Sequence, residues 1–352
     1  MKKSATSVEK ISPAKSGRVR MSDVAKLAGV SVMTVSGVFR DPGDTYPVAP
    51  ETRARVLEAA QRLGYRPNGM ARAMRSQRMG NIGYVMVKET RYLIVIPEML
   101  AGVFNGLNNH DQHFTFIGVP PDQGNQAPTL PRAVREHSVD ALIVDATVGV
   151  GPAVRKRLEE SRVPIANLND KQVSNSVWVD DAAAARIGTQ YILSKGYRRV
   201  AFLSFSLGLH NGHYSYEVRR GAYFAVMSEA GLPAREVIIA DRPIGYQQLE
   251  AVLLSKDRPE AFVCYSDHDA MLAQRVTTRL GLKVPGDLAL LGFNGRLGNS
   301  ELSPVALTTL AIPWYEMGLA AAEMAFKLGQ TGPMATLESQ RFEATLVLGA
   351  SV

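Results

Sequence analysis

Short apolar runs alternate with amphipathic segments from residue 80 to the end of the chain. The apolar runs predict strands at 82–87, 114–119, 141–144, 165–168, 200–203, 261–265, 288–293 and, at the end, 342–348. The segments between them have helical periodicity and predict helices at 98–109, 152–161, 182–194, 217–230, 247–255, 268–280 and 314–328. This alternation is typical of parallel sheets covered by helices, and the length of the region favours two lobes over a single core.

The first part of the chain has a purely helical pattern. Ser22 is a good N-cap for a short helix that Gly29 can end in the left-handed conformation. Ser31 can cap a second helix, and Gly64 ends a third helix within 50–67. The residues expected to face inward are Val24, Leu27, Ala28, Val35, Val38, Val56, Leu57, Ala60 and Leu63. Two short helices joined at a glycine and followed by a third predict a helix-turn-helix DNA-binding unit.

The outer side of the second helix in such a unit meets base edges and phosphates. We expect this side to hold Val32, Met33, Ser36, Gly37 and Arg40. Gly37 cannot read a base, whereas Val32 and Met33 can offer apolar contact, for instance to thymine methyl groups. With the capping positions included, the predicted DNA-contacting residues of this unit are Ser22, Ser31, Val32, Met33, Thr34, Ser36 and Arg40.

A further short helix is predicted at 68–75, where Asn68 can act as the N-cap. Met70 and Met74 would share one face of about two helical turns, which are unstable alone in water. We therefore expect this helix to form only when DNA and a second copy of the chain pack against it. Its predicted DNA-contacting residues are Asn68, Met70, Ala71, Met74 and Arg75.

The positive charge of the chain is concentrated at its beginning. The net charge is +7, and residues 1–80 carry 15 Lys and Arg against 6 Asp and Glu. Of the totals of 40 and 33, this leaves 25 basic and 27 acidic side chains for residues 81–352. A solvated basic tail would account for residues 1–20 but not for the arginines between 53 and 78. A basic head on a near-neutral body favours a nucleic-acid-binding module joined to a second functional unit.

Other features of the composition favour a cytoplasmic protein without a metal or a cofactor. The chain has no apolar run of the roughly 20 residues that span a bilayer, and its basic start lacks the apolar stretch of a secretory signal. Cys264 is the only cysteine, which suits a reducing compartment. The histidines in 210–213 and 267–269 lack partners at metal-site spacing, so loop and capping roles are favoured. No dinucleotide fingerprint or set of nucleophile and base stands out.

Several sequence segments together resemble the lactose- and galactose-repressor (LacI) family. In the head they are residues 23–31 (DVAKLAGVS), 34–36 (TVS) and 64–68 (GYRPN). In the body they are residues 179–181, 196–202, 266–267, 284–287, 292–294 and 307–310. The resemblance spans about residues 18–349 and implies a helix-turn-helix head joined to a body with the fold of type I periplasmic sugar-binding proteins.

The resemblance also implies a domain organisation. Residues 1–17 would be a basic disordered tail, 18–67 the helix-turn-helix domain, 68–79 a hinge helix with its linker, and 80–352 the two-lobed domain for effector binding and dimerisation. In the family the hinge enters the minor groove, where an apolar side chain wedges between base pairs and kinks the operator. Met74 occupies that wedge position in place of the usual leucine.

The same resemblance assigns effector-binding residues by position. Arg219 matches an arginine that projects into the cleft, where it would donate to ligand hydroxyls or to a carboxylate. The other assigned residues are Ile96, Asn169, Asp170, Ser266, Asp267 and Asn294. Their alternative roles are helix caps and interlobe hydrogen bonds, and Arg219 could instead be an exposed helix charge. Residues 93–96 read Leu-Ile-Val-Ile where sugar-responsive members often have Asn-Pro-Phe-Phe, which argues against a simple sugar.

We therefore predict a regulator, most readily a repressor, whose operator affinity is controlled by a small molecule such as a carbohydrate or a related metabolite. A two-fold protein needs two-fold DNA, so a homodimer would bind a pseudo-palindromic operator. No heptad repeat follows the final strand, which favours a dimer over a tetramer. The alternative is a cytoplasmic solute-binding protein or sugar-processing enzyme with an incidental basic head.

Overall fold

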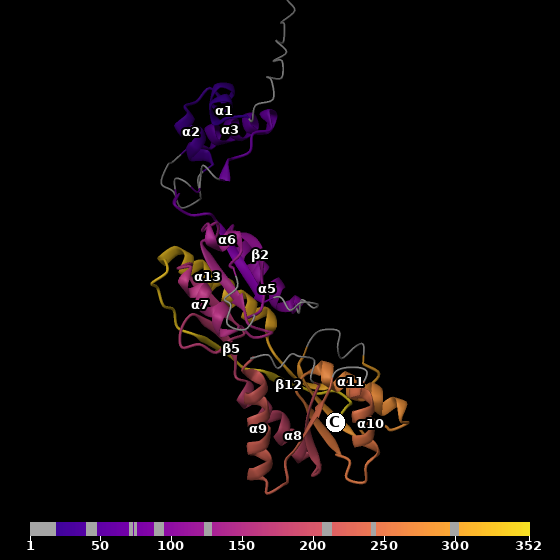
Figure 1. The fold of residues 1–352 in the computed structure, drawn as a ribbon. Helices are drawn as coiled ribbons and strands as arrows, with labels where there is room; N and C mark the ends of the chain where they lie inside the picture. Colours follow the sequence, from indigo (N-terminus) through magenta and orange to yellow (C-terminus); the bar gives the residue numbers. More distant parts are fainter. Residues whose placement is uncertain are drawn as a thin grey trace, which may run out of the picture. The chain divides into compact units, whose positions relative to one another are not determined.

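The computed structural model describes residues 19–39, 48–69, 73, 76–87, 95–122, 129–205, 213–240, 244–295 and 303–352. The chain divides into two compact units, residues 1–77 and 78–352, which we name the head and the body (Figure 1). Several predictions lie outside the described residues. They concern the tail at 1–17, the first two residues of 93–96, and the side chains of Arg40, Met70, Ala71, Met74 and Arg75.

The head contains three described helices, α1 (Met21–Ala28), α2 (Val32–Val38) and α3 (Pro50–Leu63). Gly29 ends α1 at φ 66°, and Ser31 caps α2 by accepting a hydrogen bond from the Thr34 amide at 3.0 Å, as predicted. The prediction that Ser22 caps α1 is wrong. The N-cap is Arg20, whose backbone amide donates to the Asp23 carboxylate at 2.8 Å, because an acidic residue in the first turn can reach back to the cap.

Small apolar side chains form the core of the head. Its buried residues are Val24, Ala25, Ala28, Val35, Val38, Val56, Ala59 and Ala60. Leu57, which we expected to face inward, is 45% exposed. Val56, Ala59 and Ala60 share one helical face, and Leu57 lies about 100° around the helix from Val56. The apolar stripe of α3 is therefore narrower than predicted.

The body contains two six-stranded sheets, one in each of two lobes. In the first lobe the order is β2-β1-β3-β4-β5-β11, with bounds β1 (Asn81–Val87), β2 (His113–Val119), β3 (Ala141–Asp145), β4 (Ile165–Leu168), β5 (Ser176–Val179) and β11 (Gln340–Phe342). In the second lobe it is β7-β6-β8-β9-β10-β12, with bounds β6 (Val200–Phe205), β7 (Arg235–Ile239), β8 (Ala261–Cys264), β9 (Ala289–Asn294), β10 (Thr308–Ala311) and β12 (Thr345–Val347). All strand pairs are parallel except β10 with β12. This confirms the predicted fold class.

Helices cover both faces of each sheet (Figure 1). Their bounds are α5 (Pro97–Asn108), α6 (Arg132–Arg135), α7 (Pro152–Glu160), α8 (Asp181–Ser194), α9 (Ser215–Glu229), α10 (Ile244–Leu254), α11 (Asp267–Arg279) and α13 (Trp314–Thr331). Alternate residues of β1 enter different cores: Tyr84 and Met86 pack in one apolar cluster, and Val85 and Val87 in another. Among the described residues, no helix is both long and apolar enough to cross a bilayer.

The chain passes between the lobes three times, from β5 to α8, from β10 to α13 and from β11 to β12. The predicted single strand at 342–348 is therefore wrong, because residues 343–344 carry the chain from one sheet to the other. The carboxyl ends of β5 and β10 lie at the lobe boundary. Since neighbouring parallel strands end at the same edge, the side chains that follow these strands gather at that boundary.

Candidate nucleic-acid interface and effector site

The first turn of α2 is the most exposed apolar feature of the head. Val32 is 47% exposed and Met33 is 63% exposed, although both are large apolar side chains in a folded helix. Beside them, the hydroxyls of Ser31 and Thr34 lie 2.9 Å apart. The N-terminal turn of α2 therefore presents apolar side chains beside hydroxyl groups, which is a suitable arrangement for contact with base edges and phosphates.

The last turn of α2 differs from the prediction. Ser36 is 9% exposed and Gly37 is also buried, so neither belongs to the outer side of the helix. The physical reason is that α2 is only seven residues long and contacts both α1 and α3, which together cover its C-terminal half. The outer side is thus confined to the first turn.

Basic side chains are exposed on the helices around α2. Lys26 extends from α1, and Arg53, Arg55 and Arg62 extend from α3. Asn68 is exposed, as is Ser22 in the first turn of α1. Exposed guanidinium and ammonium groups bind phosphates without reading sequence, so these side chains can supply affinity while the first turn of α2 supplies selectivity.

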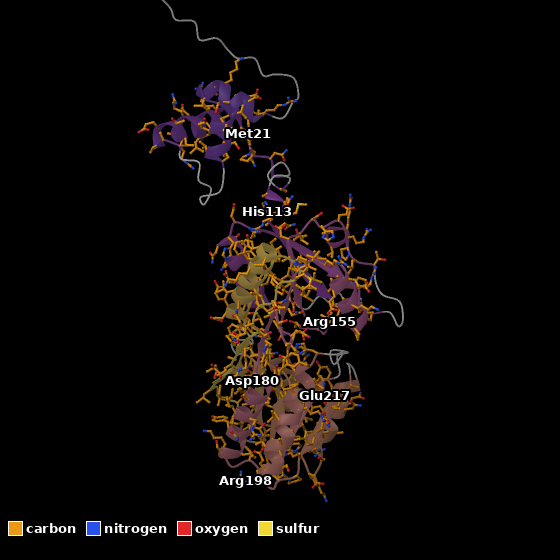
Figure 2. The ribbon with its side chains drawn as sticks, turned by 90° about the vertical axis from the view of Figure 1, so that its left-hand side faces the viewer. Met21, His113, Arg155, Asp180, Arg198 and Glu217 are labelled. Carbon is orange, nitrogen blue, oxygen red and sulfur yellow. The ribbon has the colours of Figure 1, made fainter. Side chains whose placement is uncertain are left out.

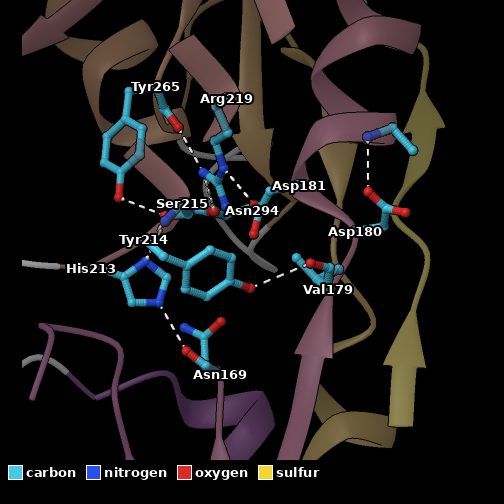
Figure 3. A network of polar contacts seen from close by, with 11 residues as sticks. Asn169, Val179, Asp180, Asp181, His213, Tyr214, Ser215, Arg219, Tyr265 and Asn294 are labelled. Carbon is cyan, nitrogen blue, oxygen red and sulfur yellow. Dashed lines mark hydrogen bonds and ion pairs between the residues drawn. The ribbon is translucent and has the colours of Figure 1, made fainter. Parts of the chain in front are cut away.

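In the body, Arg219 of α9 lies at the centre of a buried polar network (Figure 3). Its Nε donates to Asp181 Oδ1 at 2.7 Å, and its Nη1 donates to the Tyr265 carbonyl at 2.8 Å and to Asn294 Oδ1 at 3.1 Å. Its guanidinium carbon lies 3.6 Å from the centroid of the Phe293 ring. With a side chain only 5% exposed, Arg219 is not the surface charge of the alternative interpretation.

A second part of this network joins the two lobes. His213, which precedes α9, has its Nε2 2.9 Å from the carbonyl oxygen of Asn169 in the first lobe. Because a carbonyl only accepts, Nε2 carries the proton and Nδ1 accepts from the Ser215 hydroxyl at 2.6 Å. The Ser215 hydroxyl also lies 3.1 Å from the Tyr265 hydroxyl. Burial lowers the pKa of His213, which keeps the imidazole neutral.

Tyr214 makes a further contact across the lobe boundary. Its hydroxyl donates to the Val179 carbonyl at the end of β5, at 3.3 Å (Figure 3). Burial, followed by the nearby Asp181 carboxylate, raises the pKa of Tyr214. The Asn169 side chain points back into the first lobe, where its amide donates to the Thr147 hydroxyl at 3.2 Å. The first lobe thus offers mainly backbone carbonyls to the side chains of the second.

The remaining assigned residues make their contacts within one lobe. Asp170 accepts from Arg155 of α7 at 2.6 Å, and Figure 2 places Arg155 in the first lobe. Ser266 caps α11, accepting from the Asp269 amide at 3.2 Å, so its capping alternative is confirmed. Asp267, at the first position of α11, accepts from the Thr309 hydroxyl at 2.5 Å. Ile96 is the buried residue before α5.

Sequence reasoning missed several residues of the site. The sequence pattern gives His213 no ligand role, because a histidine in a loop has no distinctive spacing, and only the fold brings it to Asn169. Another missed group is Asp145, at the end of β3, which accepts from the Tyr84 hydroxyl at 2.7 Å. Burial raises the pKa of Asp145, while hydrogen bonds from Thr147 and Tyr84 oppose the rise. An isolated aspartate after a short apolar run carries no signal that would have revealed this pairing.

Comparisons with known proteins agree with this architecture. Residues 20–68 match the family "Bacterial regulatory proteins, lacI family", and residues 189–352 match the "Periplasmic binding protein-like domain". The chain is 29% identical over 313 residues to the HTH-type transcriptional regulator RegA of Clostridium saccharobutylicum, covering 87% of this chain and 91% of the relative. It is also 29% identical over 314 residues to the sucrose operon repressor of Shigella flexneri, covering 86% and 92%.

The fold is similar to that of solved regulators. The lac repressor dimer, solved bound to operator and the anti-inducer ONPF, matches with a TM-score of 0.75 and 20% sequence identity, over 95% of this chain and 99% of that one. A helix-turn-helix head joined to a two-lobed periplasmic-binding-like body defines a DNA-binding transcription regulator. The head matches the LacI family of these regulators, and the chain as a whole is similar to regulators of this kind.

Proposed function

We propose that this protein is a cytoplasmic homodimer that binds a pseudo-palindromic operator and changes its operator affinity when a small molecule occupies the body. It would act without catalysis, most readily as a repressor. The observation that carries the proposal is the first turn of α2, where Val32 and Met33 are exposed among basic side chains. Adjacent exposed apolar side chains that are rimmed by polar and basic groups are typical of an interaction surface.

The head and the hinge would both contact DNA, each through its own residues. Ser31, Val32, Met33 and Thr34 would contact base edges and the adjacent phosphates, and Ser22 would contact the backbone. The segment 68–79 would act as the hinge, with its contacts made by Asn68, Met70, Ala71, Met74 and Arg75. Arg40 would bind a phosphate. The organisation into a tail at 1–17, a head at 18–67, the hinge and a body at 80–352 is part of this proposal.

The effector would occupy the lobe boundary around Arg219, Asn294 and Asn169. Polar side chains of one lobe and backbone carbonyls of the other meet there, so a molecule placed between them would change the cost of separating the lobes. The relative named as the sucrose operon repressor supports a carbohydrate or a similar polar metabolite. Ile96, Asp170, Ser266 and Asp267 would frame the site from their own lobes.

The His213–Asn169 contact provides a route from the effector to the DNA. It is a direct hydrogen bond between the lobes, so a ligand that lengthens or shortens it favours one lobe arrangement. In a dimer, a change in lobe angle would alter the separation of the two hinges and hence their ability to pack on DNA. The coupling therefore requires only a difference in ligand affinity between the two arrangements.

The test of DNA binding is selection of operators from a random library by the purified full-length protein. We expect salt-sensitive enrichment of a pseudo-palindrome. Met33→Asp should then lower affinity for the selected operator at least tenfold, because a base contact is worth about 1–3 kcal/mol and the new charge repels phosphate. Met334→Asp, at a body residue 92% exposed, is the matched control and should bind as the parent does. Unselective binding to the library would contradict the proposal.

Deletion of residues 1–79 separates this proposal from a solute-binding protein or a sugar-processing enzyme. The truncated body should lose operator binding and keep ligand-induced thermal stabilisation. DNA binding that survives the deletion, or turnover of a stabilising sugar, would favour the alternatives.

A further inference from the structure

One carboxylate holds the chain at the point where it enters the body. We name residues 78–81 the linker exit, which begins directly after the division between the two units. Asp140, the residue before β3, accepts from the Met79 amide at 2.7 Å through Oδ1. Its Oδ2 accepts from the Gly80 amide at 2.7 Å and from the Asn81 amide at 3.3 Å. Because hydrogen bonds to an ionised acceptor are about twice as strong as neutral ones, these three bonds hold the linker exit firmly.

Two further contacts set the direction of the linker exit. The Gly80 carbonyl accepts from the His113 amide of β2 at 2.7 Å, and Gly80 itself has φ 61°, a left-handed conformation that glycine adopts without strain. The Arg78 side chain donates to the Gln330 carbonyl in the last turn of α13 at 3.0 Å. Together with Asp140, these contacts attach the linker exit to β2, to α13 and to the start of β3.

The bond to Asp140 decides how much of the linker can move. Among the described residues the Met79 amide bonds to no other group, whereas Gly80 keeps its bond to His113 through the carbonyl. Without the carboxylate, residue 79 would therefore join the movable part of the linker. One residue extends the reach of a chain by about 3.3–3.6 Å, and one base pair lengthens duplex DNA by about 3.4 Å. The released slack thus matches the change in half-site separation that one base pair makes.

From these observations we infer that Asp140 determines the spacing of the two half-sites that the homodimer accepts, because it fixes the linker exit in each protomer. The inference rests on the proposed function, since it needs a dimer and a two-part operator. Asp140 acts through the linker amides and not on the DNA itself, which makes it a positioning residue. Its loss broadens the accepted spacing and leaves unchanged the bases that the first turn of α2 contacts.

The experiment measures the affinity of full-length variants for duplexes that differ only in half-site spacing. The selected operator is compared with versions that have one base pair more or one fewer at the centre. The parent should bind these versions at least about tenfold more weakly, because contacts in one half-site are lost. For Asp140→Asn the loss should be at most about threefold, since the amide nitrogen of asparagine cannot accept from the linker amides. Equal spacing preferences in the two proteins, or a parent without a spacing preference, would overturn the inference.

Asp122→Asn is the matched control. Asp122 belongs to the same lobe and also accepts from backbone amides, those of Ala153 at 3.0 Å and Val154 at 2.9 Å, but these lie in the first turn of α7 and not in the linker exit. Both variants should melt at a lower temperature than the parent, while only Asp140→Asn changes the spacing preference. A broadened preference in both variants would assign the effect to a general loosening of the lobe and would contradict the inference.

A further measurement needs no folded Asp140 variant. In the parent protein without DNA, hydrogen exchange should show protection of the Met79 and Gly80 amides, and the selected operator should change their exchange rates less than about twofold, because the carboxylate already holds them. Rapid exchange of these amides in the free protein would overturn the inference. Unselective DNA binding would reject the proposed function, whereas a selected operator with an unchanged spacing preference in Asp140→Asn would reject the role of Asp140 alone.

Discussion

The two lobes have the same strand order, but their helices pack in different ways. In each sheet the first strand of the lobe lies next to one edge strand, and a short strand near the C-terminus forms the opposite edge. This short strand is parallel to its neighbour in the first lobe and antiparallel to it in the second. The first lobe packs α5 against α13 with backbones in contact at Gly102 and Gly318. The second packs α8 on its sheet, where Gly188 faces the leucine side chains of β9 and β10.

The lobes also differ in their charged groups at the boundary. The ion pair of the second lobe, Arg219 with Asp181, has side chains only 5% and 0% exposed. The corresponding pair of the first lobe, Arg155 with Asp170, is 27% and 12% exposed. The more deeply buried ion pair thus lies in the second lobe, while the first lobe contributes backbone carbonyls, those of Asn169 and Val179, to the contacts across the boundary. Two lobes with the same topology can therefore differ in how deeply their charged groups are buried, and substitutions should reveal this as a difference in stability.

The largest expected loss of stability follows from a substitution in the buried ion pair. Arg219→Met should lower the free energy of unfolding of the body by about 3–5 kcal/mol, because it leaves a buried carboxylate without its cation. Arg155→Met should cost about 1 kcal/mol, since water still reaches that pair. Urea denaturation measures both values. The double variant Arg219→Met with Asp181→Leu should recover much of the loss, and equal losses in the two single variants would remove the contrast between the lobes.

The next largest effect on stability concerns two glycines within helices, Gly318 in α13 and Gly188 in α8. A Cβ at Gly318 would overlap the carbonyl of Met99, which belongs to backbone and cannot move alone. A Cβ at Gly188 would lie 2.6 Å from a Leu291 methyl and 2.8 Å from a Leu310 methyl, which can rotate away. Gly318→Ala should therefore cost about 3 kcal/mol and Gly188→Ala about 1 kcal/mol, as judged by thermal unfolding. The reverse order would show that the first lobe is the more adaptable one.

A smaller change in the stability of the body is expected when the pH is varied. Burial raises the pKa of Asp269, at the start of α11, to about 7. Between the unfolded value of 3.8 and this folded value the native state holds more protons, so its stability falls as the pH rises through that window. Most of this loss falls below pH 7, and the part that remains between pH 6.5 and 8 should be about 1 kcal/mol. His213 has a lowered pKa, so its contribution is lost only as the pH falls below about 6.5.

Asp269→Asn tests this assignment. The variant should lose the decline in melting temperature between pH 6.5 and 8, because asparagine resembles the protonated carboxyl and cannot titrate. Asp145→Asn is the matched change in the first lobe, where burial also raises the pKa of the carboxyl. A decline that persists undiminished in Asp269→Asn would assign the titration to another group.

The smallest effects are gains that should be alike in both lobes. Nothing lies within 4 Å of a Cβ placed at Gly221 in α9 or at Gly118 in β2. Gly221→Ala should stabilise by up to about 1 kcal/mol, and Gly118→Thr by about 0.5–1 kcal/mol, through lower chain entropy and better local propensity. Calorimetric melting measures both. A loss in either variant would indicate that the position is covered by a partner.

Much of the fold was predictable because it depends on local patterns. The runs at 82–87 and 165–168 correspond to β1 and β4, since apolar side chains close together in sequence enter the same core. Gly29 and Ser31 marked the turn of the head because left-handed backbone and side-chain capping are properties of single residues. The strands β5, β7 and β10 were missed, because short runs with charged or hydroxyl residues do not stand out from loops.

The amino-acid sequence by itself indicated the family resemblance, most of the helices and strands, and the segregation of positive charge, because these follow from motifs, periodicity and composition over short windows. Only the tertiary structure decided that Ser36 is covered, that Arg219 is already neutralised and that His213 bonds to a residue 44 positions earlier. Such contacts depend on which distant segments meet when the chain crosses between the lobes. A side chain can bind a ligand or form hydrogen bonds within the folded chain. Which of the two it does depends on the neighbours that the fold brings to it.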